Sequence, residues 1–131
     1  MTALFLCLAL LQPAKAQDRT LTIGYLALQA DPRYSETRRE ARYLLQTTGR
    51  PLPAAELALE ESRFPGLALG VTFELVTAAG RNPDELRAAL DELAGQGVRF
   101  VLADLPAELL SGLAAASRDR ELLLFNLSAR E

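Results

Sequence analysis

The sequence contains no histidine and only one cysteine, Cys7, among its 131 residues. These absences exclude a Ser-His-Asp triad, a Cys-His pair, a disulfide framework and most zinc sites. Acid–base catalysis would have to rest on carboxylates, tyrosine or arginine, which is a narrower set of groups. The composition therefore favours binding over catalysis. We expect a protein that is not an enzyme, with no catalytic residue, no metal site and no cofactor.

Charge and hydropathy describe a small globular domain without a surface for nucleic acid. The net charge is −3, nearly every cation is arginine, and Lys15 is the only lysine. The sequence has no basic block of the kind that nucleic-acid binding requires. Half of the residues are apolar, which is enough to form a core. The length fits a single domain.

A short apolar segment opens the chain and has the character of a secretion signal. Residues 3–11 are almost all apolar, but the run is too short to span a bilayer, which takes roughly 20 residues. The small residues Ala14 and Ala16 predict cleavage after Ala16. We therefore expect residues 1–16 to be a signal peptide and residues 17–131 to form a periplasmic domain without direct membrane insertion. The alternative is that the apolar run is a buried strand or helix of the domain itself.

Beyond the signal, apolar strand patterns alternate with helix patterns. Asn82 as N-cap, Pro83 at N1 and Glu85 at N3 mark a strong helix start. Pro65 and Gly66 are expected to end the preceding helix. The alternation predicts an α/β fold with a doubly wound parallel sheet, strand order 2-1-3-4 and right-handed crossovers. The predicted strands are 21–28, 71–78, 98–103 and 121–126, and the predicted helices are 54–63, 82 to Gly95 or Gly97, and 106–117.

In open parallel sheets, ligands bind beyond the carboxyl ends of the strands, where the strand order reverses. Here that point lies between the first and third predicted strands, and nearby helix N-termini favour anions such as a carboxylate. Structural alternatives stay open: Asp104 caps the third helix, Asn126 and Ser128 satisfy the backbone at a strand end, and Gln29 is a solvated loop residue. The candidate ligand-binding residues are Gln29, Asp104, Leu105, Asn126 and Ser128.

The connection after the first strand, residues 31–53, is rich in Arg and Tyr and exceeds the roughly 2–6 residues usual in such folds. Residues 35–46 are predicted to form a short helix, and residues 49–53 a turn. The connection either presents guanidinium groups to an anionic ligand or partner over the crevice, or is a solvated surface. No GxGxxG or GxxxxGK[ST] motif supports nucleotide binding. The candidate loop contacts are Arg33, Tyr34 and Arg39.

Four segments in this order resemble a known family. They are GYL at 24–26, GRPLPAAELALEE at 49–61, VRFVLADLP at 98–106 and LLFNLSAR at 123–130. The set resembles the start of type 1 periplasmic solute-binding proteins of ABC transporters, the branched-chain amino-acid-binding class. More narrowly, it resembles the subgroup linked to pyrroloquinoline quinone (PQQ)-dependent alcohol dehydrogenase systems.

The resemblance implies a two-lobed receptor that closes on a small solute, carboxylate-bearing or alcohol-related, and delivers it to an ABC permease. In amino-acid-binding members, hydroxyl residues after the third strand and a Ser/Thr-containing segment after the fourth hold the carboxylate and amine of the ligand. Ser128 matches the second segment, whereas Asp104, Leu105 and Pro106 supply no Ser at the first. An amino acid is therefore only one option for the ligand.

Because receptors of this class have two lobes and are much longer, we expect the chain to be an N-terminal fragment that carries the first lobe. Two other hypotheses stay open. A ligand-free sensory or accessory protein of a periplasmic PQQ-dependent alcohol oxidation system would keep the fold, and the missing Ser and the apolar Leu105 favour it. A secreted α/β enzyme is the weakest hypothesis, since both His and a mature Cys are absent.

Overall fold

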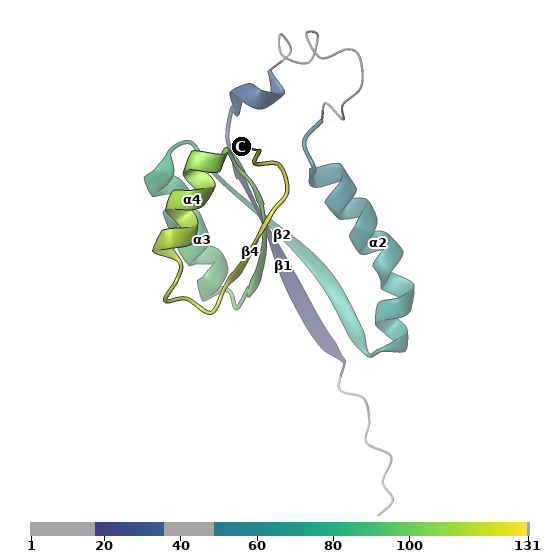
Figure 1. The fold of residues 1–131 in the computed structure, drawn as a ribbon. Coiled ribbons are helices and arrows are strands. Elements are labelled where there is room, and N and C mark those ends of the chain that lie inside the picture. The colour runs from purple at the N-terminus through teal and green to yellow at the C-terminus, as the bar shows by residue number, and fades with distance from the viewer. Residues whose placement is uncertain (1–17, 36–48, 131) are drawn as a thin grey trace, which may run out of the picture.

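The computed structural model describes residues 18–35 and 49–130 (Figure 1). Signal residues 1–16, Arg39 and most of the predicted helix 35–46 lie outside this part, so their predictions stay untested. No helix of the described part is long and apolar enough to cross a membrane. The elements are β1 (Arg19–Leu28), the short 3-10 helix η1 (Pro32–Tyr34), α2 (Leu52–Ala68), β2 (Val71–Gly80), α3 (Pro83–Gly95), β3 (Phe100–Asp104), α4 (Ala107–Ala116) and β4 (Leu123–Asn126).

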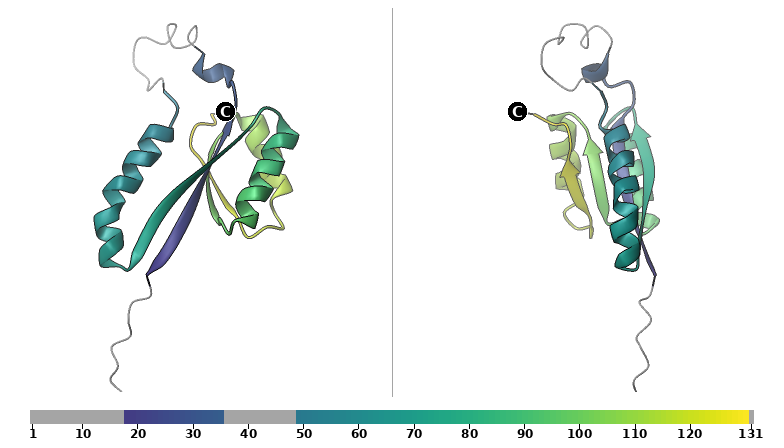
Figure 2. Two further views of the ribbon diagram at one scale, coloured as in Figure 1. Left: turned by 180° about the vertical axis from the view of Figure 1, so that it is seen from behind. Right: turned by 90° about the vertical axis from the view of Figure 1, so that its right-hand side faces the viewer.

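The four strands form one parallel sheet in the order β2-β1-β3-β4, which confirms the predicted α/β fold and strand order. Helix α2 lies on one side of the sheet, and α3 and α4 lie on the other (Figure 2). This arrangement places the carboxyl ends of β1, β3 and β4 at one edge. The residues that follow these three strands are therefore neighbours in space.

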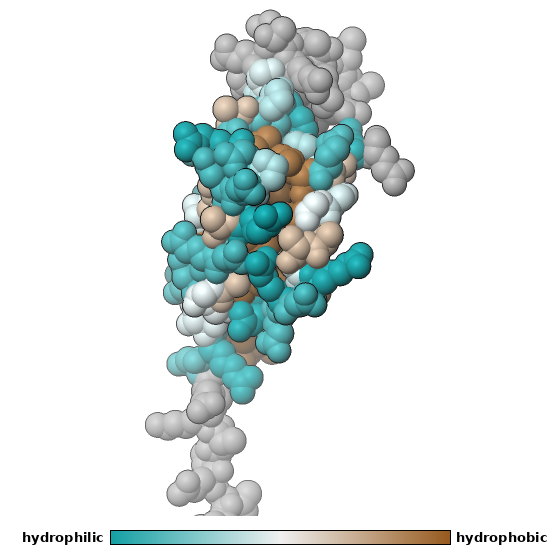
Figure 3. All heavy atoms as spheres, turned by 90° about the vertical axis from the view of Figure 1, so that its left-hand side faces the viewer, coloured by the Kyte–Doolittle hydropathy of each residue, from teal (hydrophilic) through white to brown (hydrophobic). Residues whose placement is uncertain are grey.

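The core forms between the sheet and α3. Four α3 residues, Leu86, Ala89, Leu90 and Leu93, are buried and pack against apolar strand residues, as their spacing predicts. The predicted start of this helix is also confirmed, since the Asn82 side chain accepts a hydrogen bond from the Glu85 N–H at 2.9 Å. On the outer side of α3 and α4, hydrophilic side chains cover much of the surface and hydrophobic ones show between them (Figure 3).

The predicted end of the helix before β2 is wrong. Helix α2 continues through Pro65 and Gly66 to Ala68, and Pro65 lies inside its last turns. The chain leaves the helix at Gly70, whose φ of 66° suits glycine. Gly66 has a packing role instead, because a Cβ there would come within 2.6 Å of the Val71 carbonyl oxygen. The helix therefore ends at Ala68, two residues before the glycine that permits a left-handed turn.

Gly80, at the end of β2, should tolerate no side chain. A Cβ at this position would lie 2.6 Å from the Leu86 backbone nitrogen and 2.8 Å from the Glu85 carbonyl carbon. We expect Gly80→Ala to lower the free energy of unfolding by about 1–3 kcal/mol, because backbone atoms would have to move. The matched control is Gly112→Ala inside α4, where a Cβ meets nothing within 4 Å. Gly112→Ala should raise the free energy of unfolding by roughly 0.5–1 kcal/mol. Urea titrations measure both variants, and equal effects would contradict the close packing around Gly80.

Candidate functional site

A buried carboxylate lies at the carboxyl end of the sheet. Asp104, the last residue of β3, is 0% exposed, so its charge needs partners within the protein. Its side chain receives contacts from three hydroxyls and two guanidinium groups. They come from Tyr25 Oη at 2.9 Å, Tyr34 Oη at 2.6 Å, Ser128 Oγ at 2.5 Å, Arg33 Nη2 at 3.2 Å and Arg50 Nη1 at 3.5 Å.

We call this group, together with Asp31, the Asp104 cluster. Its members come from five separate places along the chain: β1, η1 with its N-cap Asp31, the end of the connection before α2, β3 and the segment after β4. Tyr25 lies in β1 two residues before Ala27, which pairs with Asp104, so the two side chains share one face of the sheet. Ala30 then turns the chain with a φ of 50°, a backbone conformation uncommon for any residue but glycine. Directly after it, η1 carries Arg33 and Tyr34 back over the strand ends.

Arg33 joins three parts of the site through hydrogen bonds. Its Nε and Nη2 groups donate to the Asp31 carboxylate at distances from 2.6 to 3.1 Å, and Nη2 also reaches Asp104. Its Nη1 group donates to the Leu105 carbonyl at 3.1 Å and to Ser128 Oγ at 3.0 Å. All three guanidinium nitrogens are therefore engaged by the protein itself. Arg33 ties η1 to the segments that follow β3 and β4.

Arg50 approaches the same carboxylate from the far end of the long connection. Its Nη2 group donates to the Leu28 carbonyl at 3.0 Å, and its guanidinium carbon lies 4.9 Å from the centre of the Tyr34 ring. Arg33 lies 5.3 Å from the same ring, so both cations contact one aromatic side chain. The remaining N–H groups of Arg50 have no acceptor among residues 18–35 and 49–130. The Arg50 side chain is 33% exposed.

The cluster balances its charges and holds its phenols protonated. Two carboxylates, Asp31 and Asp104, face two arginines. Burial and the hydrogen bond to Asp104 raise the pKa of Tyr25 well above its ordinary range, and the same two causes raise the pKa of Tyr34. Burial alone would raise the pKa of Asp31, but the hydrogen bonds and charge of Arg33 outweigh it and lower that pKa.

Asp31 should make the fold sensitive to acid. Its pKa in the folded protein lies below the ordinary value of 3.8, so its ionised form stabilises the fold above about pH 4. This stabilisation is lost as the pH falls through the lowered pKa. We expect Asp31→Asn to weaken the fold at pH 7 and to flatten the decline in stability below pH 4. Urea titrations at a series of pH values measure both effects, and an unchanged acid decline in the variant would contradict the pairing.

Some of the predicted site residues belong to the Asp104 cluster, and others lie outside it. Asp104 and Ser128 meet in the cluster, and Leu105 is buried and contributes its carbonyl. Asp104 does not cap α4, whose N-cap is Pro106 without a side-chain hydrogen bond, so that alternative is wrong. The Asp104 carboxylate is instead engaged by five side-chain donors of the cluster. Arg33 and Tyr34 fold onto the strand ends, so the solvated-surface alternative is wrong for these two residues.

The two remaining predicted residues lie at the rim. Asn126 Oδ1 accepts hydrogen bonds from the backbone N–H groups of Ser128 and Ala129 at 3.1 and 2.8 Å, which confirms its alternative role of satisfying a strand end. Gln29 is exposed, and its backbone N–H donates to the Gly80 carbonyl at 2.8 Å. The role of both residues in ligand binding stays a prediction.

Sequence reasoning missed Tyr25, Asp31 and Arg50 as site residues. Strand alternation could have indicated Tyr25, because its side chain lies on the same face as that of Ala27, which pairs with Asp104. Asp31 sits two residues before Arg33, a spacing that suits a short side chain accepting from the backbone of a turn. For Arg50 no local signal exists, since its partners Leu28 and Asp104 lie 22 and 54 residues away.

No known family model matches the sequence, and no curated protein matches it significantly. The resemblance to solute-binding proteins therefore stays a hypothesis carried by the four segments named above. No group of three or more Cys, Asp or Glu residues that could hold a metal ion occurs in the described part of the chain. The site is thus a hydrogen-bonded ion cluster whose members can position polar groups at the edge of the sheet.

Proposed function

We propose that the chain forms one lobe of an exported solute-binding protein that serves an ABC permease. The lobe binds a small solute at the carboxyl edge of its sheet, between the segments that follow β1, β3 and β4. In this class of receptor a second lobe closes over the solute, so a single lobe supplies only part of the contacts. The protein binds and releases its ligand without changing it.

One observation carries the proposal. The Asp104 cluster gathers side chains from β1, η1, the end of the connection before α2 and the segment after β4 at the strand-order switch point of the sheet. That is where open parallel sheets bind ligands. Because Asp104 itself is fully buried, it positions the groups around it and does not contact solute. The exposed groups at this rim are the Gln29 side chain, the Asn126 side chain and part of the Arg50 guanidinium.

The charge balance of the cluster bears on the solute. Arg33 is engaged throughout by Asp31, Asp104 and backbone carbonyls, so it offers little to an anion. Arg50 keeps N–H groups that have no acceptor in the described part of the chain, and one carboxylate would suit them. The exposed amide of Gln29 suits a hydroxyl, whereas the amide of Asn126 already bonds the backbone of Ser128 and Ala129. We therefore favour a small hydroxyl- or carboxylate-bearing solute, such as an alcohol or an alcohol-derived acid, over an amino acid.

A second candidate function is a ligand-free sensory or accessory protein of a PQQ-dependent alcohol oxidation system. The observation in its favour is that the charged and hydroxyl groups of the cluster bond to one another. The Ser128 hydroxyl, which the family resemblance assigns to ligand binding, lies 2.5 Å from an Asp104 oxygen and donates to it. In this alternative the Ser128 hydroxyl serves the cluster and does not bind a ligand.

Isothermal titration calorimetry separates the two functions. The purified chain is titrated with short alcohols, their acids and a set of amino acids. We expect measurable, weak binding of at least one alcohol-derived acid, and its loss in Gln29→Ala. The control is Gln96→Ala, an exposed residue at the C-terminal end of α3, which should bind as well as the unaltered chain. Absence of heat with every compound would contradict solute binding and support the accessory function.

A further inference from the structure

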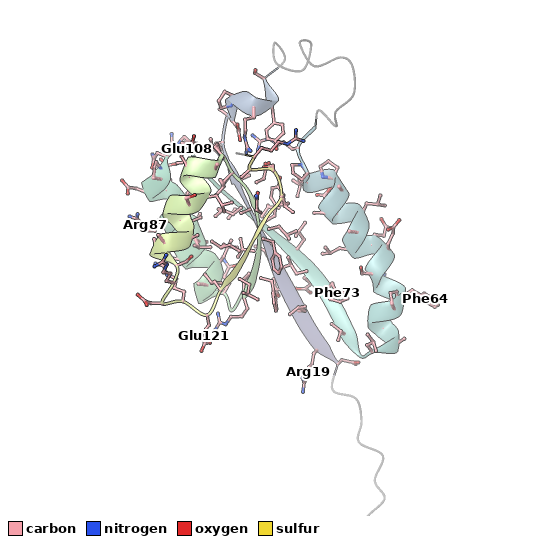
Figure 4. The ribbon with its side chains drawn as sticks, in the orientation of Figure 1. Arg19, Phe64, Phe73, Arg87, Glu108 and Glu121 are labelled. Carbon is pink, nitrogen blue, oxygen red and sulfur yellow. The ribbon has the colours of Figure 1, made fainter. Side chains whose placement is uncertain are left out.

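Helix α2 turns its largest apolar side chains away from the sheet. Its buried residues are the small Ala55 and Gly66, and Gly66 packs against Val71 and Phe73 of β2. Leu57 is 57% exposed and Phe64 is 86% exposed. Figure 4 shows Phe64 pointing outward from α2, whereas Phe73 of β2 lies between the strand and the helix. In α3 the arrangement is the reverse, since its leucines are buried.

These outward side chains form one surface. Leu57 and Phe64 are seven residues apart, which is close to two helical turns and places them on the same face. Leu67, one turn beyond Phe64, is 67% exposed, and Leu69 just after the helix is 77% exposed. Single exposed apolar residues are ordinary, but a series of large ones along one helix marks a contact site. We call Leu57, Phe64, Leu67 and Leu69 the α2 patch.

Acidic residues lie among the residues of the patch. Glu56, Glu60 and Glu61 are all exposed on α2, and Arg63 is the one cation of this helix. A second copy of the chain docked through the same face would bring these carboxylates together, which disfavours self-association. A partner that presents lysine or arginine beside apolar side chains would instead complement both features.

We propose that the α2 patch is the docking surface for a partner protein with an amphipathic, basic helix or surface. Phe64 and Leu57 provide the apolar anchors, and the three glutamates set the charge of the partner. Aromatic residues at the centre of such contacts carry a large share of the binding energy. The proposal is independent of solute binding, because α2 packs on β2 and Phe64 points outward from the end of α2 that is farther from the carboxyl ends of the strands.

A synthetic helical peptide of leucine and lysine, labelled with a fluorophore, tests the docking surface by fluorescence anisotropy. We expect the peptide to bind the chain and Phe64→Ser to weaken this binding at least about tenfold, with unchanged circular dichroism. Leu123→Ser is the matched control, because Leu123 is 57% exposed on β4. It should leave the affinity within about twofold. A double variant, Glu60→Gln with Glu61→Gln, should weaken binding and reduce its salt dependence.

Three results would overturn the proposal. The first is equal affinity of the unaltered chain and Phe64→Ser for the peptide. The second is equal binding of a matched leucine–glutamate peptide, which would show that the glutamates do not select the partner. The third is a dimer in analytical ultracentrifugation that Phe64→Ser dissociates, which would assign the patch to a second copy of the chain. None of these results depends on whether the sheet edge binds a solute.

Discussion

Asp104→Ala should lower the free energy of unfolding by about 3–5 kcal/mol, or prevent folding altogether. The substitution leaves two arginines without their shared carboxylate and three hydroxyl donors without an acceptor at the edge of the sheet. Removal of one partner from a buried ion pair costs this much because the remaining charge stays uncompensated. Equilibrium unfolding in urea, followed by circular dichroism, measures the loss.

Two further variants keep this test decisive if Asp104→Ala does not fold. Asp104→Asn preserves the shape and one acceptor oxygen, so it should fold and lose a smaller part of the stability. Asp119→Asn removes a carboxylate from an exposed position and should change stability by less than about 0.5 kcal/mol. Equal stability of Asp104→Asn and Asp119→Asn would contradict the central role of the buried carboxylate.

Arg33→Met should also lower the free energy of unfolding by about 3–5 kcal/mol, because it removes the cation of the buried ion pair instead of the carboxylate. Methionine fills much of the same space but leaves Asp31 and Asp104 buried without the cation between them. The pKa of Asp31, now lowered by Arg33, should rise in the variant, so the loss should shrink as the pH falls. Urea titrations at neutral and acidic pH measure both changes.

The matched control for this arginine is Arg87→Met. Arg87 lies on α3, is 50% exposed, and its nearest carboxylate is Asp84 at 3.6 Å. Exposed pairs of this kind contribute roughly 0–1 kcal/mol, so the control should be nearly neutral. The double variant Arg33→Met with Asp104→Ala should lose less than the sum of the two single losses, because both remove the same ion pair. Simple additivity would contradict a shared network.

The cluster ties the two ends of the long connection between β1 and α2 to one point. Arg33 and Tyr34 contact Asp104 from the first end, and Arg50 does so from the second. The rim residues that we assign to solute are thereby fixed relative to the strand ends, since rigid supporting contacts hold a binding group in place. A loss of Asp104 should therefore impair solute binding as well as stability.

Much of the fold was predictable because its signals are local. The apolar strands and the stripe on α3 repeat at regular intervals, and Asn82 with Glu85 marks the start of α3 within four residues. The parallel order follows from the alternation of strands and helices. The prediction of the end of α2 was wrong. Pro65 by itself is a strong signal for the end of a helix, but tertiary packing of Gly66 on β2 extends the helix past it.

The cluster was predictable only in part, because its contacts join distant residues. Asp104 and Ser128 could be placed at the correct edge from the strand order alone. The bond from Tyr25 to Asp104 spans 79 positions, and that from Arg33 to Asp104 spans 71. The chain also turns before Arg33 at Ala30, whose positive φ cannot be foreseen from the sequence because alanine seldom adopts it.

Titration of the isotope-labelled chain with alcohol-derived acids, followed by two-dimensional NMR, tests solute binding at the sheet edge most directly. We predict that the shifted backbone amide signals group at residues 28–30, 104–105 and 126–128 and at Arg50, and that Asp104→Asn reduces these shifts. Shifts confined to other surfaces, such as the outer side of α3, or no shifts with any compound, would contradict the assignment of this edge as a solute-binding site.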